Sequence, residues 1–351
     1  MKVGLAIVMQ SGDSRSDGTI YREELALAEL AEPLGFDSVW CTEHHFTDYM
    51  IVPDPLQLLT FLAARTSRVQ LGTAIIVVPW HDPVRLAEQV IVLDTLSGGR
   101  AIVGLGRGSG KLEFQGLRVP MEESRERFAE SIAVLRKALS GEPFRHQGRF
   151  FDIPEITVRP RPSHDLKERL YGAAVSPGSA EIVAGLGLGM LIIPQRPWDE
   201  TAADVVQFAA ARASHGLPPQ APITMCWVCV GETDAAAEAD ARRYMGAYWQ
   251  SADRHYGLSA GQHQGVKGYE FFRDVGALVR DSATEDQIDN YLRFHVVGSP
   301  RTCLEKIRFI QQQVKNDHFV GVFRYGGMSA ELGEKNARRF ATQVMPELRQ
   351  M

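Results

Sequence analysis

Short, almost continuously apolar runs alternate along the chain with amphipathic segments of helical period. Runs that are apolar on both faces predict parallel strands buried between helices, and therefore an α/β fold. The eight expected strands are Val3–Met9, Ser38–Cys41, Val69–Val78, Ala101–Leu105, Arg169–Ala174, Gly189–Ile193, Ile223–Val230 and Phe319–Tyr325. The expected helices are Tyr21–Leu34, Pro55–Thr66, Pro83–Leu96, Glu122–Leu139, Pro177–Gly185, Glu200–Ser214, Thr233–Trp249, Pro300–Val314 and Ser329–Leu348.

Eight strand–helix units are the number that closes a (β/α)8 TIM barrel. We therefore predict one barrel domain over residues 1–351, with insertions. An open, doubly wound sheet is the alternative, although it would normally contain fewer strands. Four helix starts are marked by a capping residue followed by proline, which predicts the first helical position. They are Asp54-Pro55, Asp82-Pro83, Ser176-Pro177 and Ser299-Pro300.

Two stretches interrupt the alternation. Gly141–Ser163 is rich in proline, arginine and aromatic residues, and we expect a small hairpin there. Ser251–Val297 is longer and contains glycines at 261, 265 and 268. Long insertions on a compact barrel often serve as active-site lids, so we predict a mobile lid at about residues 251–297.

Composition narrows the class of partner. The formal net charge is −5 and no basic block stands out, which argues against nucleic acid and anionic membranes. No apolar run approaches the roughly 18 residues of a membrane span. The four scattered cysteines do not suggest a disulfide framework, and they are typical of a reducing cytoplasm.

Polar residues at the carboxyl ends of barrel strands are the candidates for chemistry. Glu43, His44 and His45 follow the second expected strand and could form a metal site, an acid/base pair or a buried polar cluster. The other histidines do not fall at strand ends as a ligand set, so we predict no metal.

A phosphate site is the second candidate. Gly104, Gly106, Gly108 and Gly110 alternate after the fourth strand, without the dinucleotide-binding or Walker spacing. Arg107 within this loop offers two parallel N–H donors to a phosphate. The alternative is an ordinary bend with Arg107 in a surface ion pair. Ser176 and Ser179 follow the fifth strand at an expected helix start, where anions bind well, although Ser176 could simply be a helix cap.

Several motifs, in this order and spacing, resemble those of the bacterial luciferase-like flavin monooxygenases, closest to the luciferase α-subunit branch. The resemblance extends from Lys2 to Pro346. The motifs are Thr42-Glu-His-His-Phe46, Leu71-Gly-Thr-Ala74, Pro83-Val-Arg-Leu-Ala-Glu88, Leu93-Asp-Thr-Leu-Ser-Gly-Gly-Arg100 and Val297-Gly-Ser-Pro300.

This resemblance implies a barrel that binds FMNH2, activates O2 as a peroxyflavin and oxygenates a small organic substrate. A separate flavin reductase would supply the reduced FMN, and a single-gene relative would be a homodimer. It implies that His44 is catalytic. Glu43, as the preceding residue, could orient His44 or could instead bond elsewhere in the barrel mouth. It also implies a non-proline cis peptide around Ala74-Ile75 beneath the flavin ring. The residues expected to contact the cofactor are Glu43, Ala74, Gly106, Arg107, Arg125, Ser176 and Ser179.

Two positions depart from the luciferase pattern. Gly106 stands where luciferases have an active-site cysteine, and Val175 stands where they have an acidic residue. Light emission with a long-chain aldehyde is therefore not expected, and Gly106 would leave space beside the flavin. Two other interpretations remain, a deazaflavin-dependent dehydrogenase on the same fold and a non-catalytic flavin-binding relative.

Overall fold

Parallel strands form a closed barrel at the centre of the molecule. The computed structural model describes residues 1–11 and 15–351. Within these residues, eight strands close in the order β12-β1-β2-β3-β5-β8-β9-β10, with β10 pairing again with β12. They are β1 (Lys2–Ile7), β2 (Ser38–Cys41), β3 (Gln70–Thr73), β5 (Ala101–Gly106), β8 (Leu170–Ala173), β9 (Gly189–Ile192), β10 (Ile223–Val230) and β12 (His318–Val322). The TIM barrel is confirmed and a strand is present in all eight expected segments, but Val69–Val78 is divided into β3 and a two-residue strand at Ile76–Val77.

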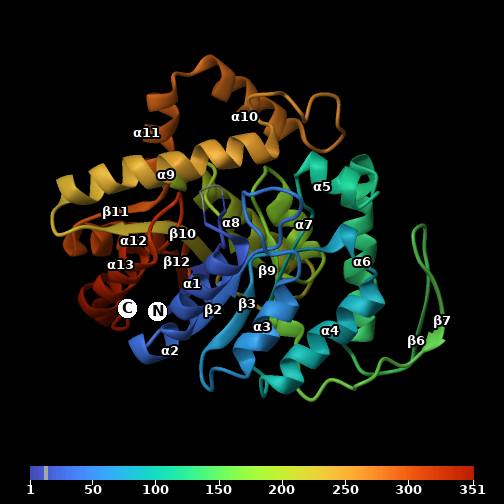
Figure 1. The fold of residues 1–351 in the computed structure, drawn as a ribbon. Coiled ribbons are helices and arrows are strands. Elements are labelled where there is room, and N and C mark those ends of the chain that lie inside the picture. The colour runs from blue at the N-terminus through green and yellow to red at the C-terminus, as the bar shows by residue number, and fades with distance from the viewer. Residues whose placement is uncertain (12–14) are drawn as a thin grey trace.

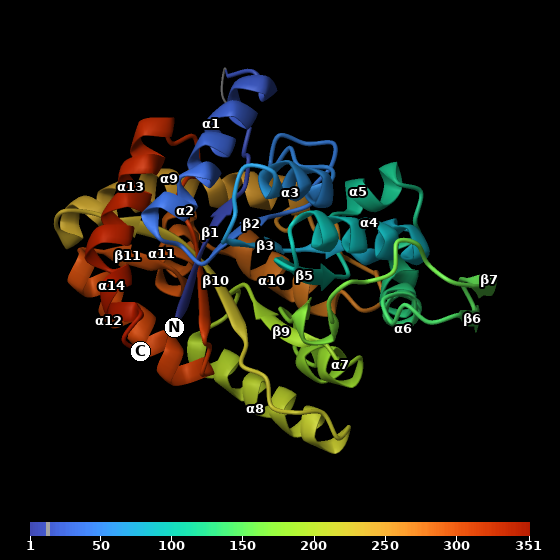
Figure 2. The same ribbon diagram turned by 90° about the horizontal axis from the view of Figure 1, so that it is seen from below.

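Helices surround the barrel on its outside (Figure 2). Beside the barrel strands are α1 (Asp17–Glu29), α2 (Ala31–Leu34), α3 (Pro55–Ala63), α4 (Pro83–Leu96), α6 (Ser124–Ala138), α7 (Ser179–Gly185), α8 (Trp198–Ser214), α12 (Pro300–Val314), α13 (Ala330–Gln343) and α14 (Met345–Leu348). Short 3-10 turns are η1 (Val78–Trp80), η2 (Met121–Glu123) and η3 (Lys167–Arg169). The two described ends of the chain lie close together below the barrel (Figure 1).

The helix starts test the capping predictions. Asp54, Asp82 and Ser299 each accept a backbone N–H at the start of α3, α4 and α12, as expected. The prediction for Ser176-Pro177 is wrong, because α7 begins at Ser179. Gly178 takes the left-handed backbone conformation, with φ 77°, and this turn delays the helix. The Ser176 hydroxyl is therefore left for a different partner.

Tryptophan fills the inside of the barrel. Trp40 on β2 is fully buried, and its indole N–H donates to the Ser38 hydroxyl at 2.7 Å. A Cβ at Gly4 on β1 or at Gly72 on β3 would collide with the Trp40 ring. The two flanking strands thus need glycine at these positions, because the indole occupies the space that a side chain would take.

Both predicted insertions have regular structure. Strands β6 (Phe144–Gln147) and β7 (Asp152–Ile156) form the expected antiparallel hairpin, which projects from the barrel (Figure 1). The second insertion is mainly helical. Helix α9 (Asp234–Tyr256) continues past residue 251, and α10 (Glu270–Asp281), α11 (Thr284–Phe294) and β11 (Val296–Gly298) follow. This segment lies across the upper end of the barrel in Figure 1, with α10 close to α5 (Lys111–Gly116). The short strand β4 (Ile76–Val77) pairs with β5.

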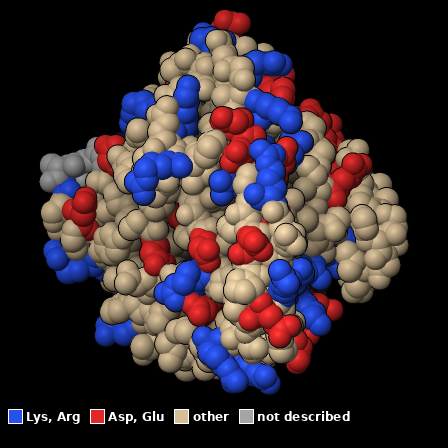
Figure 3. Space-filling model, turned by 90° about the vertical axis from the view of Figure 1, so that its right-hand side faces the viewer, with Lys and Arg blue, Asp and Glu red and all other residues tan. Residues whose placement is uncertain are grey.

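The outer surface carries both kinds of charge. On the face shown in Figure 3, lysine and arginine side chains are interspersed with acidic ones. Among the described residues, the helices are all too short or too polar to cross a bilayer.

Candidate active site

A cavity opens at the carboxyl ends of the barrel strands, beneath the helical insertion. Six of the eight site residues predicted from the sequence line it. They are Glu43, His44, Ala74, Arg107, Ser176 and Ser179. Gly106 and Arg125 lie outside the described lining. The barrel rule therefore located this cavity correctly, since parallel strands bring their carboxyl ends to one rim.

One end of the cavity is suited to an anion. Arg107 lies in the loop after β5, with its guanidinium carbon 4.1 Å from the centre of the Tyr269 ring. Its Nη1 is buried and has no hydrogen-bond partner among the described residues. The hydroxyls of Ser176 and Ser179 lie 2.7 Å apart. A cation with an unused N–H and two hydroxyl donors can together bind a phosphate group.

Arg125 lies on the outer side of this group, near the insertion. A Cβ at Gly268 would come within 2.9 Å of Arg107 Nη1 and within 3.6 Å of Arg125 Nε. Both arginines thus approach the same glycine. Burial lowers the pKa of Arg107, and the nearby charge of Arg125 lowers it further. An anion placed between the two cations would relieve this repulsion.

The backbone of the cavity lining contains the expected non-proline cis peptide. The Ala74–Ile75 peptide is cis, as the resemblance implied. The space expected beside Gly106, however, is not free. A Cβ on Gly106 would collide with the Ile75 side chain, which fills this position. That part of the sequence interpretation is wrong, because the residue after the cis bond turns toward the glycine.

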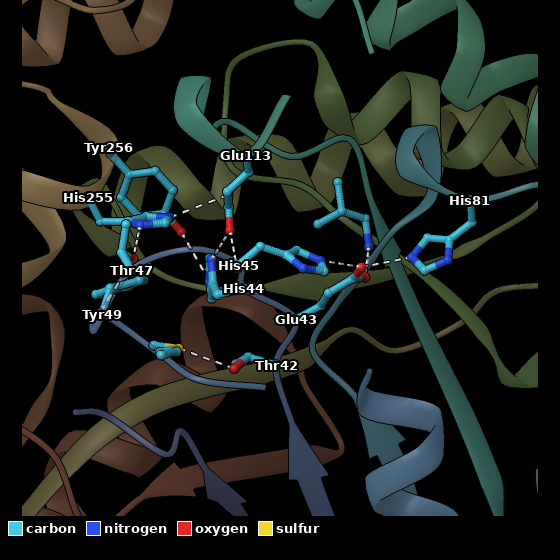
Figure 4. A network of polar contacts seen from close by, with 12 residues as sticks. Thr42, Glu43, His44, His45, Thr47, Tyr49, His81, Glu113, His255 and Tyr256 are labelled. Carbon is cyan, nitrogen blue, oxygen red and sulfur yellow. Dashed lines mark hydrogen bonds and ion pairs between the residues drawn. The ribbon is translucent and has the colours of Figure 1, made fainter. Parts of the chain in front are cut away.

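His44 is held by an acid that the sequence reading did not identify. Its Nδ1 lies 3.1 Å from Glu113 Oε1 on α5, and its Nε2 lies 3.5 Å from the Tyr256 hydroxyl (Figure 4). The same Glu113 oxygen accepts the backbone N–H of His45 at 2.8 Å. His255, near the end of α9, approaches the other Glu113 oxygen at 3.4 Å. Glu113 therefore bridges two imidazoles.

Glu43 does not contact His44 and instead bonds elsewhere in the barrel mouth, which is the second of the two expectations for it. Its carboxylate lies 3.2 Å from His45 Nε2 and 2.7 Å from His81 Nε2, and accepts the backbone N–H of Val77 at 2.7 Å (Figure 4). Adjacent residues in this extended segment point to different sides, which sends Glu43 and His44 to separate partners. His45 thus bonds to Glu43 through its side chain and to Glu113 through its backbone N–H.

The two acids are both held in the charged form. Burial alone would raise the pKa of Glu113, but His44 and His255 outweigh it and hold the value at about 2. Burial would likewise raise the pKa of Glu43, but hydrogen bonds from His45 and His81 lower it. In return, Glu43 raises the pKa of His81 against the effect of burial. The cavity wall therefore contains two buried carboxylates, each paired with histidines.

The depressed pKa of Glu113 predicts a pH-dependent contribution to stability. Because the folded-state value of about 2 lies below the ordinary 4.5, this contribution is complete above pH 4.5 and lost as the pH falls toward 2. Denaturant titrations would give the free energy of unfolding of the wild type and of Glu113→Gln at each pH. The difference between the two values should become smaller as the pH falls from 4.5 toward 2. Glu122→Gln on the surface is the control. A difference that stays constant with pH would contradict the assignment.

The chain is similar in sequence to a known enzyme family and to individual proteins. The family model for luciferase-like monooxygenases matches residues 1–315. The chain is 23% identical over 359 residues to the oxygenase component of flavin-dependent trigonelline monooxygenase from Acinetobacter baylyi, covering 99% of this chain and 95% of that one. It is 34% identical over 155 residues to the uncharacterized protein y4vJ of Sinorhizobium fredii, where the match spans only 44% of each chain.

Solved structures share the fold along the whole chain. Monooxygenase RslO1 from Streptomyces bottropensis superposes with a TM-score of 0.79 at 26% identity, covering 99% of both chains. The oxygenating constituent of 3,6-diketocamphane monooxygenase from Pseudomonas putida, in complex with FMN, superposes with a TM-score of 0.77 at 19% identity, covering 99% of this chain and 98% of that one.

Proposed function

Because this chain belongs to the luciferase-like monooxygenase family, we propose that it binds reduced FMN and uses dioxygen to oxygenate a small organic substrate. The observation that carries this proposal is the composition of the cavity. Its lining combines Arg107, Ser176 and Ser179, which suit a phosphate, with His44, which suits proton transfer. The similarity to a flavin-dependent oxygenase component and to an FMN complex supports the same cofactor.

The residues present fit the flavin phosphate. Arg107 would pair with the phosphate through its unused Nη1, and the Ser176 and Ser179 hydroxyls would donate to its oxygens. We propose that Arg125 adds charge from the rim, and that Ala74 and Gly106 shape the wall beside the ring. When bound, reduced FMN supplies the electrons that activate dioxygen.

His44 is the residue that we propose for proton transfer. Glu113 faces Nδ1 and fixes the orientation of the ring, so Nε2 is the atom directed toward Tyr256, which also lines the cavity. Glu43 supports this wall through His45 and His81.

The test is oxygen consumption after the flavin-free protein is mixed anaerobically with FMNH2 and then with oxygen. We expect FMNH2 to bind and, with a substrate, one oxygen atom from labelled O2 to appear in the product. Binding of a deazaflavin in preference to FMN, with no use of oxygen, would replace the proposal with a dehydrogenase. Tight FMN binding with no turnover across a broad substrate panel would favour a non-catalytic flavin-binding protein.

We also propose that residues 251–297 include a mobile lid over the cavity. The Tyr269 hydroxyl lies 2.8 Å from the Gly108 carbonyl oxygen, to which it donates, and 2.9 Å from the Ser124 hydroxyl. His263 lies 2.9 Å from the Ser109 carbonyl oxygen. These contacts join the insertion to the loop that contains Arg107. A closed insertion would keep water from the reacting flavin and favour product over hydrogen peroxide.

Tyr269→Phe should loosen this closure, because it removes both hydroxyl contacts and keeps the ring over Arg107. The loss favours opening by about 1–3 kcal/mol, since each neutral hydrogen bond contributes about 0.5–1.5 kcal/mol. More hydrogen peroxide should form per FMNH2 consumed, measured with a peroxidase-coupled dye. Tyr21→Phe, which also loses a bond to a backbone carbonyl, is the control. Unchanged coupling in Tyr269→Phe would argue against a lid.

The proposed assembly is a homodimer supplied by a separate flavin reductase. Phe61 on α3 and Val92 and Leu96 on neighbouring α4 are exposed apolar side chains, which is compatible with self-association. The cysteines of the described chain are unpaired and buried, which is compatible with our proposal of a cytoplasmic location.

A further inference from the structure

His44, Glu113 and His255 form a compact set of metal-type ligands. One nitrogen or oxygen from each residue lies within 4.8 Å of the others. His44 Nδ1 lies 3.1 Å from Glu113 Oε1, and His255 Nε2 lies 3.4 Å from the other carboxylate oxygen, Oε2. Ligand atoms bound to one tetrahedral ion at about 2.0–2.2 Å would lie roughly 3.3–3.6 Å from one another. Both separations are close to that range, and side-chain rotation would have to bring the two imidazoles onto one ion.

The orientation of His255 points to a cation independently of this spacing. Its Nδ1 lies 2.7 Å from the Thr47 hydroxyl, which fixes the ring. Its Nε2 is buried and, among the described residues, has no hydrogen-bond partner of acceptable geometry, although it faces the Glu113 carboxylate. An unpartnered imidazole nitrogen that faces a carboxylate is the arrangement that a cation bound between the two groups would satisfy.

We propose that His44, Glu113 and His255 bind one first-row divalent transition-metal ion, such as Zn²⁺ or Co²⁺. Two imidazoles and one carboxylate suit these ions, whereas Mg²⁺ and Ca²⁺ prefer oxygen ligands. Thr47 is the outer partner that orients a ligand histidine, as outer partners do in established metal sites. His44 and Glu113 also line the cavity, which leaves a side of the ion open to water.

Metal binding here would inhibit the reaction. An ion bound to His44 Nδ1 takes the position of the proton shared with Glu113 and fixes the ring in one protonation state. The inhibition rests on the proposed role of His44, whereas metal binding itself does not. The two are distinguishable, because binding can be measured on flavin-free protein without any turnover.

The test is a titration of the flavin-free protein with Co²⁺, followed by its visible absorption, and with Zn²⁺ by calorimetry. We expect one ion per chain and an intensified Co²⁺ absorption band, as a tetrahedral site gives. His255→Gln should weaken binding by at least about 10-fold, since even the loss of an outer partner costs this much. His263→Gln is the matched control, because His263 is also buried in the insertion and has an unpartnered nitrogen. It lies outside the ligand set.

Equal affinities in the wild type and in His255→Gln would overturn the proposal, as would the absence of binding to the wild type. A circular dichroism spectrum and a melting curve establish whether His255→Gln is folded. If it is not, anomalous scattering from Zn²⁺ in crystals of the wild type decides the question. A peak between His44, Glu113 and His255 supports the site, and a zinc ion bound only elsewhere refutes it.

Discussion

His44→Ala is expected to slow oxygenation by about 10²- to 10⁴-fold, the usual contribution of a positioned acid or base. FMN binding should remain nearly unchanged, because the phosphate contacts that we propose come from Arg107 and the two serines. The expected defect therefore lies in turnover and not in cofactor affinity. Rapid mixing of protein-bound FMNH2 with oxygen and substrate would give the rate, and flavin fluorescence would give the affinity.

His45→Gln is the matched control for this variant. His45 is the adjacent histidine, its side chain bonds to Glu43, and it is outside the described cavity lining. Glutamine can still donate to Glu43, so turnover should stay close to that of the wild type. Equal turnover in His44→Ala and the wild type would remove the proposed role of His44. An equal loss of turnover in both variants would show that turnover depends on the conformation of this segment and not on the His44 imidazole.

Arg107→Ala should weaken FMN binding by about 1.5–3 kcal/mol, which is the range for a hydrogen bond to a charged group. That corresponds to a dissociation constant raised by roughly one to two orders of magnitude. The side chain is partly buried and its Nη1 has no described protein partner, so a phosphate is the group that it can pair with. Fluorescence titration with FMN and with riboflavin measures the effect. Riboflavin has no phosphate and should bind equally to both proteins.

Arg127→Ala provides the control for a general loss of positive charge. Arg127 lies on α6, two residues from Arg125, but it stacks on Phe150 and pairs with Glu123. Its removal should leave FMN affinity almost unchanged. If Arg107→Ala binds FMN as tightly as the wild type, Arg107 is not part of the phosphate site. A parallel loss of riboflavin affinity would indicate damage to the cavity wall instead.

The barrel could be predicted because each strand is a short apolar run that can be recognised without the rest of the chain. Runs such as Ile223–Val230 are buried along their whole length, and the sequence shows this as an unbroken apolar segment. The helix starts after Asp54 and Asp82 depend on neighbouring residues alone, and they were confirmed. The prediction of a helix start after Ser176 was wrong because the capping pattern does not determine the conformation of Gly178.

Glu113 could not be assigned because α5 has only six residues, too few to show a helical period. Its role in the site depends on a contact with His255, which lies in the insertion and is remote in sequence. Tyr256, next to His255, is 212 residues from His44. No local pattern encodes that approach, since packing of α9 across the barrel mouth produces it.

The sequence by itself determined the barrel and the rim where the site lies, because these follow from the local hydrophobic pattern and from the rule that parallel strands present their carboxyl ends together. The flavin, the catalytic role of His44 and the contacts expected from Ala74, Gly106 and Arg125 came from the family resemblance and not from this pattern. The tertiary structure alone decided which acid pairs with which histidine, because such pairs depend on distances between side chains remote in sequence. In the structure Glu113 pairs with His44, Glu43 pairs with His45, and His255 lies beside Glu113.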